Sequence, residues 1–305
     1  MRILIILAAT VAALCLSNAF SQELDCGDYT FSRLTLQHLE HKGMGFNQGY
    51  STVSFFITPA TDINPFIDLK LHVFNGGEIA ANGGFGLRTA NAKENYLFGF
   101  NAYYDFRRHK NLSTQQLSCG LEFLTHYVDF RLNGYYPFFG KYSESFNPIN
   151  SLRTIRYALP CVDTSLGFTL PPPCDQIGLY LEIGYYYLFK QTATYGSHNF
   201  GTLASSSIGN AYGGRARLNC NPKEWIGFGV EYTYDRLFHS RFNGFVAFKI
   251  PLGPKHLAHS TKNRYPYKKS PCDLHLEWQQ LQTQSIARNN IVPMITRHYH
   301  RASQV

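Results

Sequence analysis

The chain has 305 residues and a formal net charge of +8, from 28 Lys and Arg against 20 Asp and Glu. Its 24 Phe, 21 Tyr and 25 Gly beside three Met are typical of a strand-rich protein with aromatic girdles. Beyond the N-terminal region no segment approaches the ~18 consecutive apolar residues of a membrane helix, which excludes a helical membrane protein. A chain of this kind that enters a membrane must do so as a closed barrel, because only helices and barrels satisfy the backbone in lipid.

The N-terminus has the pattern of a secretory signal peptide. Arg2 gives a positive start, Ile3–Cys15 is nearly all apolar, and Ser17 and Ala19 are the small residues before a cleavage site. The apolar run is too short to span a bilayer. We therefore expect residues 1–19 to be removed after export, and a buried N-terminal strand is the alternative interpretation.

Alternating apolar and polar residues indicate strands whose two faces meet different surroundings. In Asn95–Phe106 every even position is aromatic or alanine, whereas the odd positions include Asn101 and Asp105. An even number of strands is typical of bacterial barrels, and a tilted strand needs ~9–11 residues to cross the hydrocarbon. The same pattern along the chain predicts twelve strands, near 50–58, 66–76, 82–90, 95–107, 114–124, 126–138, 152–159, 162–170, 176–190, 210–220, 224–236 and 241–251.

These strands predict an all-β fold, a transmembrane antiparallel up-and-down β-barrel over residues 49–252, with residues 20–48 as a periplasmic segment before it. A soluble β-sandwich would also alternate, but its outward face should carry many Lys and Glu. Here the second face mixes glycines with single charges, as expected for a crowded lumen. Aromatic clusters near strand ends, at 103–104, 135–139 and 185–187, suit membrane interfaces, where an amphipathic ring has one wet end.

Nine charged residues fall on the polar faces of the predicted strands, and we expect them to point into the lumen. A charge that faces lipid at mid-depth costs about 2–4 kcal/mol. Opposite charges could pair across the lumen, or the same residues could line a path that selects solutes. The nine are Arg88, Asp105, Glu122, Asp129, Arg131, Glu182, Arg215, Arg217 and Glu231.

The cysteines permit disulfides, because their number is even once the signal peptide is removed and the chain is exported. Cys161 and Cys174 flank one short segment and are the first pair to consider. Cys119 and Cys220 fall on apolar strand faces, where a free buried thiol is the simplest interpretation. The spacings match no zinc pattern. The six are Cys26, Cys119, Cys161, Cys174, Cys220 and Cys272.

Residues 253–305 form a basic C-terminal tail. From position 255 onward, eight Lys or Arg stand against Asp273 and Glu277, so this stretch carries +6 of the formal +8. Such a tail could contact lipopolysaccharide, nucleic acid or an acidic host surface, or serve only solubility. For a barrel, the expected partners are outer-membrane lipid, lipopolysaccharide and the host-cell surface, and nucleic acid is not expected.

Two segments of this tail carry structural signals. Ser270–Asp273 combines a cap, a proline and an early acid, which is typical of a helix start. One apolar side of a short helix follows at Leu274, Trp278 and Leu281. Ile291–Ile295 is apolar and could form a short strand. The tail could dock at the barrel mouth, occupy the pore or bind a partner outside.

Four short motifs follow one another along the predicted strands. They are the glycine-rich strand Gly83–Arg88, the strand Phe98–Asp105, the Gly-x-Glu of Gly120–Glu122, and the strand end Asn133–Pro137. In this order and spacing they resemble the β-domain of the inverse autotransporters, the intimin/invasin family. Each motif alone is weakly specific, and the ordered series carries the resemblance.

The resemblance implies a twelve-stranded outer-membrane barrel with a periplasmic N-terminus, whose C-terminal chain threads the pore to display adhesive domains. Only residues 253–305 follow the last predicted strand, fewer than the ~100 of an immunoglobulin-like adhesin domain. We therefore expect a short version of the family in the outer membrane of a Gram-negative bacterium, inserted by the barrel-assembly machinery. It would anchor or export its own C-terminal segment and contribute to host-cell attachment. The alternative is a porin-like channel or structural barrel whose tail is periplasmic or plugs the lumen.

The sequence contains no motif that points to catalysis. Neither a Gly-x-Ser-x-Gly nucleophile elbow nor a His-Glu-x-x-His zinc motif occurs. The Gly-rich stretch 83–86 lies within a strand rather than before a helix, so phosphate cradling is not expected. We therefore predict that the protein is not an enzyme, and we assign no catalytic, cofactor-binding or metal-binding residues and no cofactor.

Overall fold

The computed structural model describes residues 30–59, 63–91, 96–125, 127–147, 152–170, 174–196, 203–252 and 286–300. The predicted signal peptide, Cys26, Cys272 and the predicted helix that starts at Ser270–Asp273 lie outside the described residues. Within the described ranges, no helix is both long enough and apolar enough to cross a bilayer.

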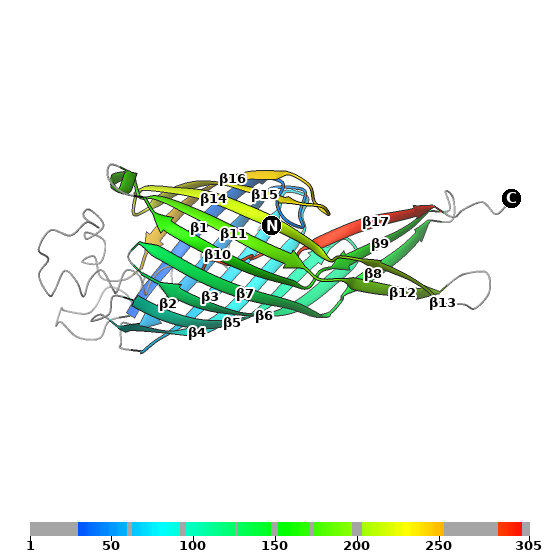
Figure 1. Cartoon of the computed structure of the whole chain (residues 1–305), viewed down its shortest axis with the longest axis horizontal. Helices are drawn as coiled ribbons and strands as arrows, with labels where there is room; N and C mark the ends of the chain where they lie inside the picture. The colour runs from blue at the N-terminus through cyan, green and yellow to red at the C-terminus, as the bar shows by residue number, and fades with distance from the viewer. Residues whose placement is uncertain are drawn as a thin grey trace, which may run out of the picture.

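Twelve antiparallel strands close into a barrel (Figure 1). The first strand pairs with the last, from Arg33↔Pro251 to His41↔Asn243, so the sheet has no free edge. An all-β, antiparallel, up-and-down barrel of twelve strands is thereby confirmed. The strands are β1 (Thr30–His41), β2 (Tyr50–Pro59), β3 (Ile63–Phe74), β4 (Ile79–Asn91), β5 (Tyr96–His109), β6 (Leu112–Leu124), β7 (Val128–Phe139), β10 (Cys161–Thr169), β11 (Leu179–Leu188), β14 (Ala211–Lys223), β15 (Ile226–Asp235) and β16 (Arg241–Pro251).

The two faces of the barrel wall differ in polarity, because successive side chains of a strand point in opposite directions. On β6, Leu117, Leu121 and Phe123 are exposed on the outside, whereas Gln116 and Glu122 are buried inside. The large hydrophobic residues exposed on the other wall strands repeat this arrangement. An apolar outer face is stable against lipid, and it requires the charged residues of the same strands to turn inward.

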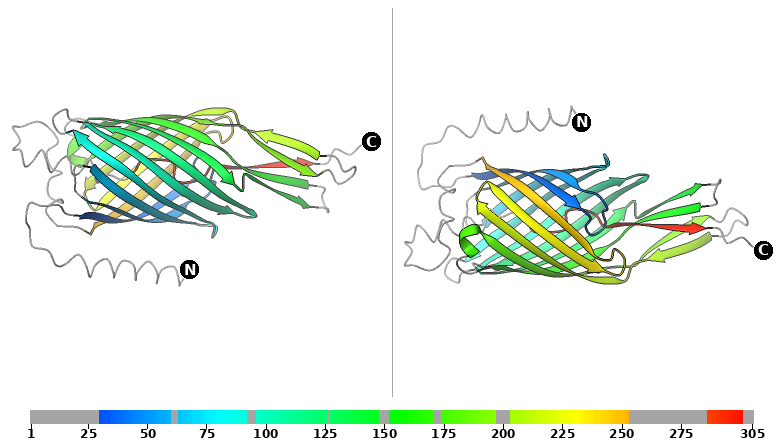
Figure 2. Two further views of the ribbon diagram at one scale, coloured as in Figure 1. Left: turned by 90° about the horizontal axis from the view of Figure 1, so that it is seen from below. Right: turned by 90° about the horizontal axis from the view of Figure 1, so that it is seen from above.

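The two ends of the barrel differ in structure. At one end, here called the terminal end, β1 begins and β16 ends, and the 3₁₀ helix η1 (Cys174–Ile177) follows β10. At the opposite end, the far end, two groups of strands project beyond the barrel (Figure 1, Figure 2). They are the sheet of β8 (Tyr142–Asn147), β9 (Leu152–Ala158) and β17 (Met294–His300), in the order β17-β9-β8, and the pair β12 (Gln191–Gly196) and β13 (Leu203–Ile208).

These projecting strands, the far-end extension, share a core of their own. Ile155 and Tyr157 of β9 are buried together with Ala193 of β12. Ile295 and Tyr299 of β17 pack against them, and β17 pairs with β9 along its whole length. The C-terminal strand is therefore an integral part of the extension.

The number of barrel strands is as predicted, but two assignments differ from the prediction. Residues 20–48 are predicted as a periplasmic segment, yet Thr30–His41 is barrel strand β1. Its outer face mixes Leu with polar residues such as His38, so local alternation is weak, and pairing with β2 and β16 decides its place. Residues 152–159 are predicted as a barrel strand, but β9 lies in the far-end sheet. A strand whose apolar side chains are buried by neighbouring strands and a strand whose apolar side chains face lipid have similar runs of apolar residues, so the local sequence does not separate them.

The predicted Cys161–Cys174 disulfide is not formed. Both thiols are free, because Cys161 is the first residue of β10 and Cys174 lies beyond the last residue of that strand, at the start of η1. A strand rises ~3.3 Å per residue, so the eight steps of β10 separate its ends by roughly 26 Å. A disulfide needs Cα atoms within about 7 Å. Cys119 is free as expected, but it lies exposed on the outer face of β6 rather than buried.

Candidate functional site in the barrel lumen

One segment of the C-terminal region, residues 286–293, lies inside the barrel; we call it the lumen segment. Ile286 is buried against Phe31, which lies near the start of β1 at the terminal end. Ile291 is buried in a cluster with Phe74, the last residue of β3 at the far end. The segment then continues into β17 outside the barrel (Figure 2). The C-terminal region therefore crosses the lumen from the terminal end to the far end.

Arg288 is the most strongly bound residue of the lumen segment. Its guanidinium donates to both carboxylate oxygens of Asp105, at 2.8 and 2.5 Å, and to the hydroxyl of Ser118 at 2.7 Å. The guanidinium carbon also lies 4.1 Å from the ring centroid of Tyr103 and 5.4 Å from that of Tyr135. A bidentate pair stacked on aromatic rings is a geometry that Arg can adopt and Lys cannot.

Hydrogen bonds from the barrel wall orient the Asp105 carboxylate for the ion pair with Arg288. Asn82 on β4 donates to one of its carboxylate oxygens at 2.7 Å, while Gln116 and Ser118 on β6 donate to the other at 3.1 and 3.0 Å. Asp105 lies on the inward face of β5, flanked by β4 and β6. Asp105 and Arg288 are both almost fully buried, so each compensates a charge that would otherwise be costly.

The wall also binds the amide groups of the lumen segment. The Tyr135 hydroxyl accepts a hydrogen bond from the Asn289 backbone N–H at 2.8 Å. Lys70 donates to the Asn290 side-chain oxygen at 3.0 Å, and Asn82 donates to the Asn290 carbonyl at 2.9 Å. Buried amide groups need such partners, so an extended segment is stable here without a strand pairing beside it.

Hydrogen bonds also hold the lumen segment where it leaves the barrel at the far end. Arg107 donates to the carbonyls of Val292 and Gly45, at 2.6 and 2.8 Å, which joins the lumen segment to the β1–β2 loop. The Pro293 carbonyl accepts from the Leu159 N–H at 3.0 Å. Gly45 has a φ of 79°, and a Cβ there would lie 2.4 Å from the Pro293 Cα. Only glycine fits this position without displacing one of the two segments.

Substitution Gly45→Ala is therefore expected to loosen the exit. Hydrogen exchange of the amides in residues 286–294 should become faster, while exchange in the barrel strands should not change. Gly77→Ala is the matched control, because Gly77 has a φ of 81° but nothing within 4 Å of the added Cβ. Both variants incur the left-handed backbone strain, so only the contact with Pro293 separates them. Equal exchange in the two variants would contradict this assignment.

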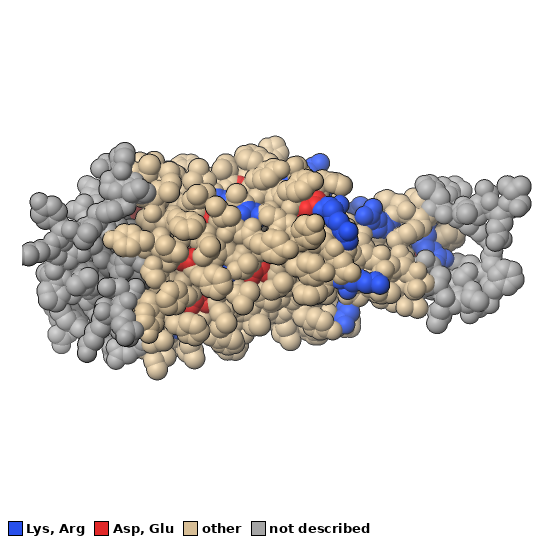
Figure 3. Space-filling model, in the orientation of Figure 1, with Lys and Arg blue, Asp and Glu red and all other residues tan. Residues whose placement is uncertain are grey.

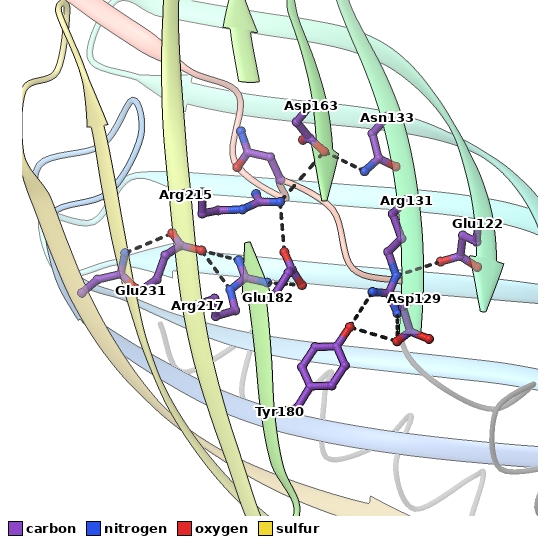
Figure 4. A network of polar contacts seen from close by, with 12 residues as sticks. Glu122, Asp129, Arg131, Asn133, Asp163, Tyr180, Glu182, Arg215, Arg217 and Glu231 are labelled. Carbon is purple, nitrogen blue, oxygen red and sulfur yellow. Dashed lines mark hydrogen bonds and ion pairs between the residues drawn. The ribbon is translucent and has the colours of Figure 1, made fainter. Parts of the chain in front are cut away.

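A second group of inward side chains forms ion pairs within the wall itself (Figure 4). Arg131 lies 3.1 Å from Asp129 and 3.8 Å from Glu122, and it donates to the Tyr180 hydroxyl at 2.9 Å. Tyr180 in turn donates to Asp129 at 2.9 Å. Arg88 pairs with Glu122 at 2.9 Å. These contacts tie β4, β6, β7 and β11 together across the lumen surface.

The pairs continue on the neighbouring strands (Figure 4). Arg215 lies 3.1 Å from Glu182 and 4.0 Å from Asp163. Arg217 pairs with Glu231 and lies 3.9 Å from Glu182. The inward orientation predicted for the nine charged residues is therefore confirmed. Eight of them form ion pairs with one another, as in the first of the two alternatives, whereas Asp105 pairs with the lumen segment.

Sequence reasoning missed the residues that bind the lumen segment. Arg288 lies 183 positions from Asp105, so no local pattern connects them. Tyr103 and Tyr135, predicted to lie at the membrane interface, instead point into the lumen and are buried. One signal was available, since Tyr103 shares the parity of Asp105, whereas Tyr104 faces outward.

Comparison with known proteins identifies the family of the barrel. Residues 29–155 match the inverse autotransporter β-domain. The predicted family is thereby confirmed over the region that contains all four motifs, and this family places the barrel in the outer membrane. No curated protein matches the chain significantly.

Solved structures match the barrel fold. A structure described as "Unveiling the Mechanism Behind the in-meso Crystallization of Membrane Proteins" has a TM-score of 0.58 and 16% identity, and the match covers 87% of this chain and 100% of that one. A KdgM porin has a TM-score of 0.42 and 9% identity, covering 71% and 98%. The Salmonella typhi outer membrane phospholipase dimer with bound calcium has a TM-score of 0.40 and 8% identity, covering 77% and 96%. At these identities the first likeness supports the fold alone.

Proposed function

We propose that this outer-membrane barrel is a non-catalytic anchor that carries its own C-terminal segment through its lumen and presents β17 on the cell surface. The observation behind the proposal is the path of residues 286–300. They enter the lumen near Phe31, pair with Asp105 through Arg288, and leave at the far end as β17. A C-terminal segment that stayed on the side of the terminal end would not form hydrogen bonds and ion pairs with the wall along the whole length of the lumen.

The proposed orientation places the far end outside the cell. Barrels of the outer membrane have short periplasmic turns and longer extracellular connections. The two long connections here are the ones that form the far-end extension, between β7 and β10 and between β11 and β14. The extension, with β17 built into it, is then the surface available for attachment to host cells, and the barrel-assembly machinery inserts the barrel.

A porin-like channel is the second candidate, and the paired charges of the lumen wall are the observation that favours it. Charged linings select solutes in open pores. The lumen segment opposes this role, since a solute would have to pass residues that are buried or half-buried along the whole stretch from Ile286 to Val292. A channel therefore requires the segment to leave the lumen.

The two candidates differ in the location of the C-terminus. An epitope tag placed after Val305 is expected to be cleaved by protease added to intact cells, once outer-membrane fractionation has been established. A tagged periplasmic protein in the same cells is the control for envelope integrity. Protection of the C-terminal tag until the cells are permeabilised would contradict surface presentation and favour a periplasmic tail. Adhesion of the same cells to host cells, compared with a variant that lacks residues 294–305, tests the role in attachment.

A further inference from the structure

Basic side chains gather on the outside of the barrel where it meets the far-end extension (Figure 3). We define the basic patch as Arg108, Lys110, Lys141 and Arg156. Arg108 ends the outward row of β5, Lys110 lies in the β5–β6 turn, Lys141 lies between β7 and β8, and Arg156 lies on β9. Arg108 and Lys110 are exposed, and the other two are partly exposed.

Hydrogen bonds connect the segments that carry the basic patch. The Asn111 side-chain oxygen accepts hydrogen bonds from Arg156 and, at 3.3 Å, from the Ser143 hydroxyl. Thr114 donates to the Gly140 carbonyl at 2.7 Å, beside Lys141. The β5–β6 turn and the β8–β9 hairpin therefore present their charges at fixed positions.

The height of the patch relative to the membrane follows from the aromatic residues beneath it. On β5 the outward positions run through Tyr104 and Phe106 and then reach Arg108, one two-residue step or about 7 Å farther along the strand. Tyr104 packs against Phe138 with ring centroids 6.3 Å apart. Aromatic residues of this kind mark the membrane interface, so the next outward position lies at the level of lipid headgroups.

Lys141 also lies beside an aromatic residue of the outer face, Tyr136. Its ammonium donates to the Tyr136 hydroxyl at 3.0 Å and lies 4.9 Å from the centroid of that ring. Tyr136 is exposed on the outer face of β7. An ammonium held over an interfacial tyrosine is directed toward the headgroups rather than into the hydrocarbon.

Nearby carboxylates balance only part of the positive charge of the patch. Among the described residues, no carboxylate forms an ion pair with Arg108, Lys110 or Lys141. Glu144 is paired with Arg153 at 3.2 Å, whereas Glu78 contacts His109 at 2.6 Å and offsets part of the charge of Arg156. A ligand that brings negative charge would therefore meet a net attractive surface.

We propose that the basic patch binds the phosphate groups of lipopolysaccharide in the outer leaflet. Phosphate oxygens are strong acceptors for guanidinium and ammonium groups, and lipid A phosphates lie at the headgroup level that Arg108 and Lys141 occupy. The inference rests on the proposed orientation, with the far end outward. It adds a specific lipid partner that would hold the barrel at a fixed depth and tilt.

The test measures binding of purified lipopolysaccharide to the full-length barrel in detergent, with phosphorylated and dephosphorylated lipid compared. Each charge near an anionic surface favours binding roughly fivefold. The triple variant Arg108→Gln, Lys110→Gln, Lys141→Gln is therefore expected to bind phosphorylated lipopolysaccharide about a hundredfold more weakly. Arg156 stays unchanged, because it holds Asn111.

The matched control is Lys223→Gln, since Lys223 lies over Trp225 at 5.7 Å on the opposite end of the barrel. It should bind like the wild type, as should Arg108→Lys, which keeps the charge. The proposal would be overturned if the triple variant bound with wild-type affinity or if Lys223→Gln lost as much affinity as the triple variant. It would also be overturned if the wild type showed no preference for phosphorylated lipid, or if inorganic phosphate alone occupied the patch equally well. Binding in detergent requires no passage of the tail, so this result is independent of the tag experiment.

Discussion

Asp105→Asn is expected to release the lumen segment, so that a barrel closed in the wild type conducts ions. The substitution leaves Arg288 buried beside an amide instead of a carboxylate, and Tyr103 cannot balance that charge. Removing one partner of a buried ion pair costs about 3–5 kcal/mol. An effect of that size shifts the balance between occupied and empty lumen by roughly a hundredfold to a few thousandfold.

The measurement is single-channel conductance of the reconstituted full-length protein in planar bilayers. Glu182→Gln is the matched control, because it makes the same change at a buried lumen carboxylate that pairs with Arg215 and Arg217 of the wall. The control should stay as closed as the wild type. An Asp105→Asn channel no more conductive than Glu182→Gln would show that the pair with Arg288 does not hold the segment.

The double variant Asp105→Asn, Arg288→Met separates loss of the pair from loss of a single charge. It removes the cation that Asp105→Asn leaves buried without a carboxylate. The conductance of the double variant should therefore lie below the sum of the increases caused by Asp105→Asn alone and by Arg288→Met alone. Residues in direct contact are expected to depart from additivity in this way. Simple addition of the two effects would place Arg288 away from Asp105 in the membrane-embedded protein.

Arg131→Met is expected to lower the stability of the barrel wall without opening the lumen. Arg131 compensates Asp129 at 3.1 Å and Glu122 at 3.8 Å, and it also binds Tyr180. Its removal leaves Asp129 with Tyr180 as its only partner among those contacts, and Glu122 with Arg88. The expected loss in free energy of unfolding is about 3–5 kcal/mol, because the carboxylates remain buried.

Urea unfolding in detergent, followed by the shift between folded and unfolded bands on unheated gels, measures this loss. Arg108→Met is the control, since Arg108 is exposed on the outside and surface charges contribute about 0–1 kcal/mol. An unfolding midpoint of Arg131→Met equal to that of Arg108→Met would contradict a stabilising role for the wall pairs.

The same Arg131→Met variant distinguishes the two candidate functions. If the barrel presents its C-terminal segment, the lumen stays filled and conductance does not change, because Arg131 contacts the wall rather than the segment. If the barrel is a channel, neutralising an inward charge alters the ion selectivity of the wild-type conductance. Asp105→Asn therefore tests whether the segment plugs the lumen, and Arg131→Met tests whether the ion pairs of the wall stabilise the barrel.

Much of the barrel was predictable from the sequence, because the outer face of a lipid-facing strand imposes a strict period of two. That constraint is local, so Asn95–Phe106 and the motif strands around it were assigned correctly, and the nine charges were placed inward by the cost of exposing them to lipid. The family followed from the same strands. The alternation was too weak at β1, whose place in the wall depends on pairing with β16 more than two hundred positions away.

The route of the C-terminal tail was decided only by the tertiary structure. The sequence predicted a basic tail with an apolar stretch at 291–295, and it left docking, plugging and external binding open, with docking or plugging slightly favoured. Arg288 finds Asp105 only after twelve strands have closed, and β17 finds β9 only beyond the far end of the same barrel. The lumen that selects this path is a property of the closed wall, since its binding groups come from the five strands β3 to β7 and meet only when these strands are paired.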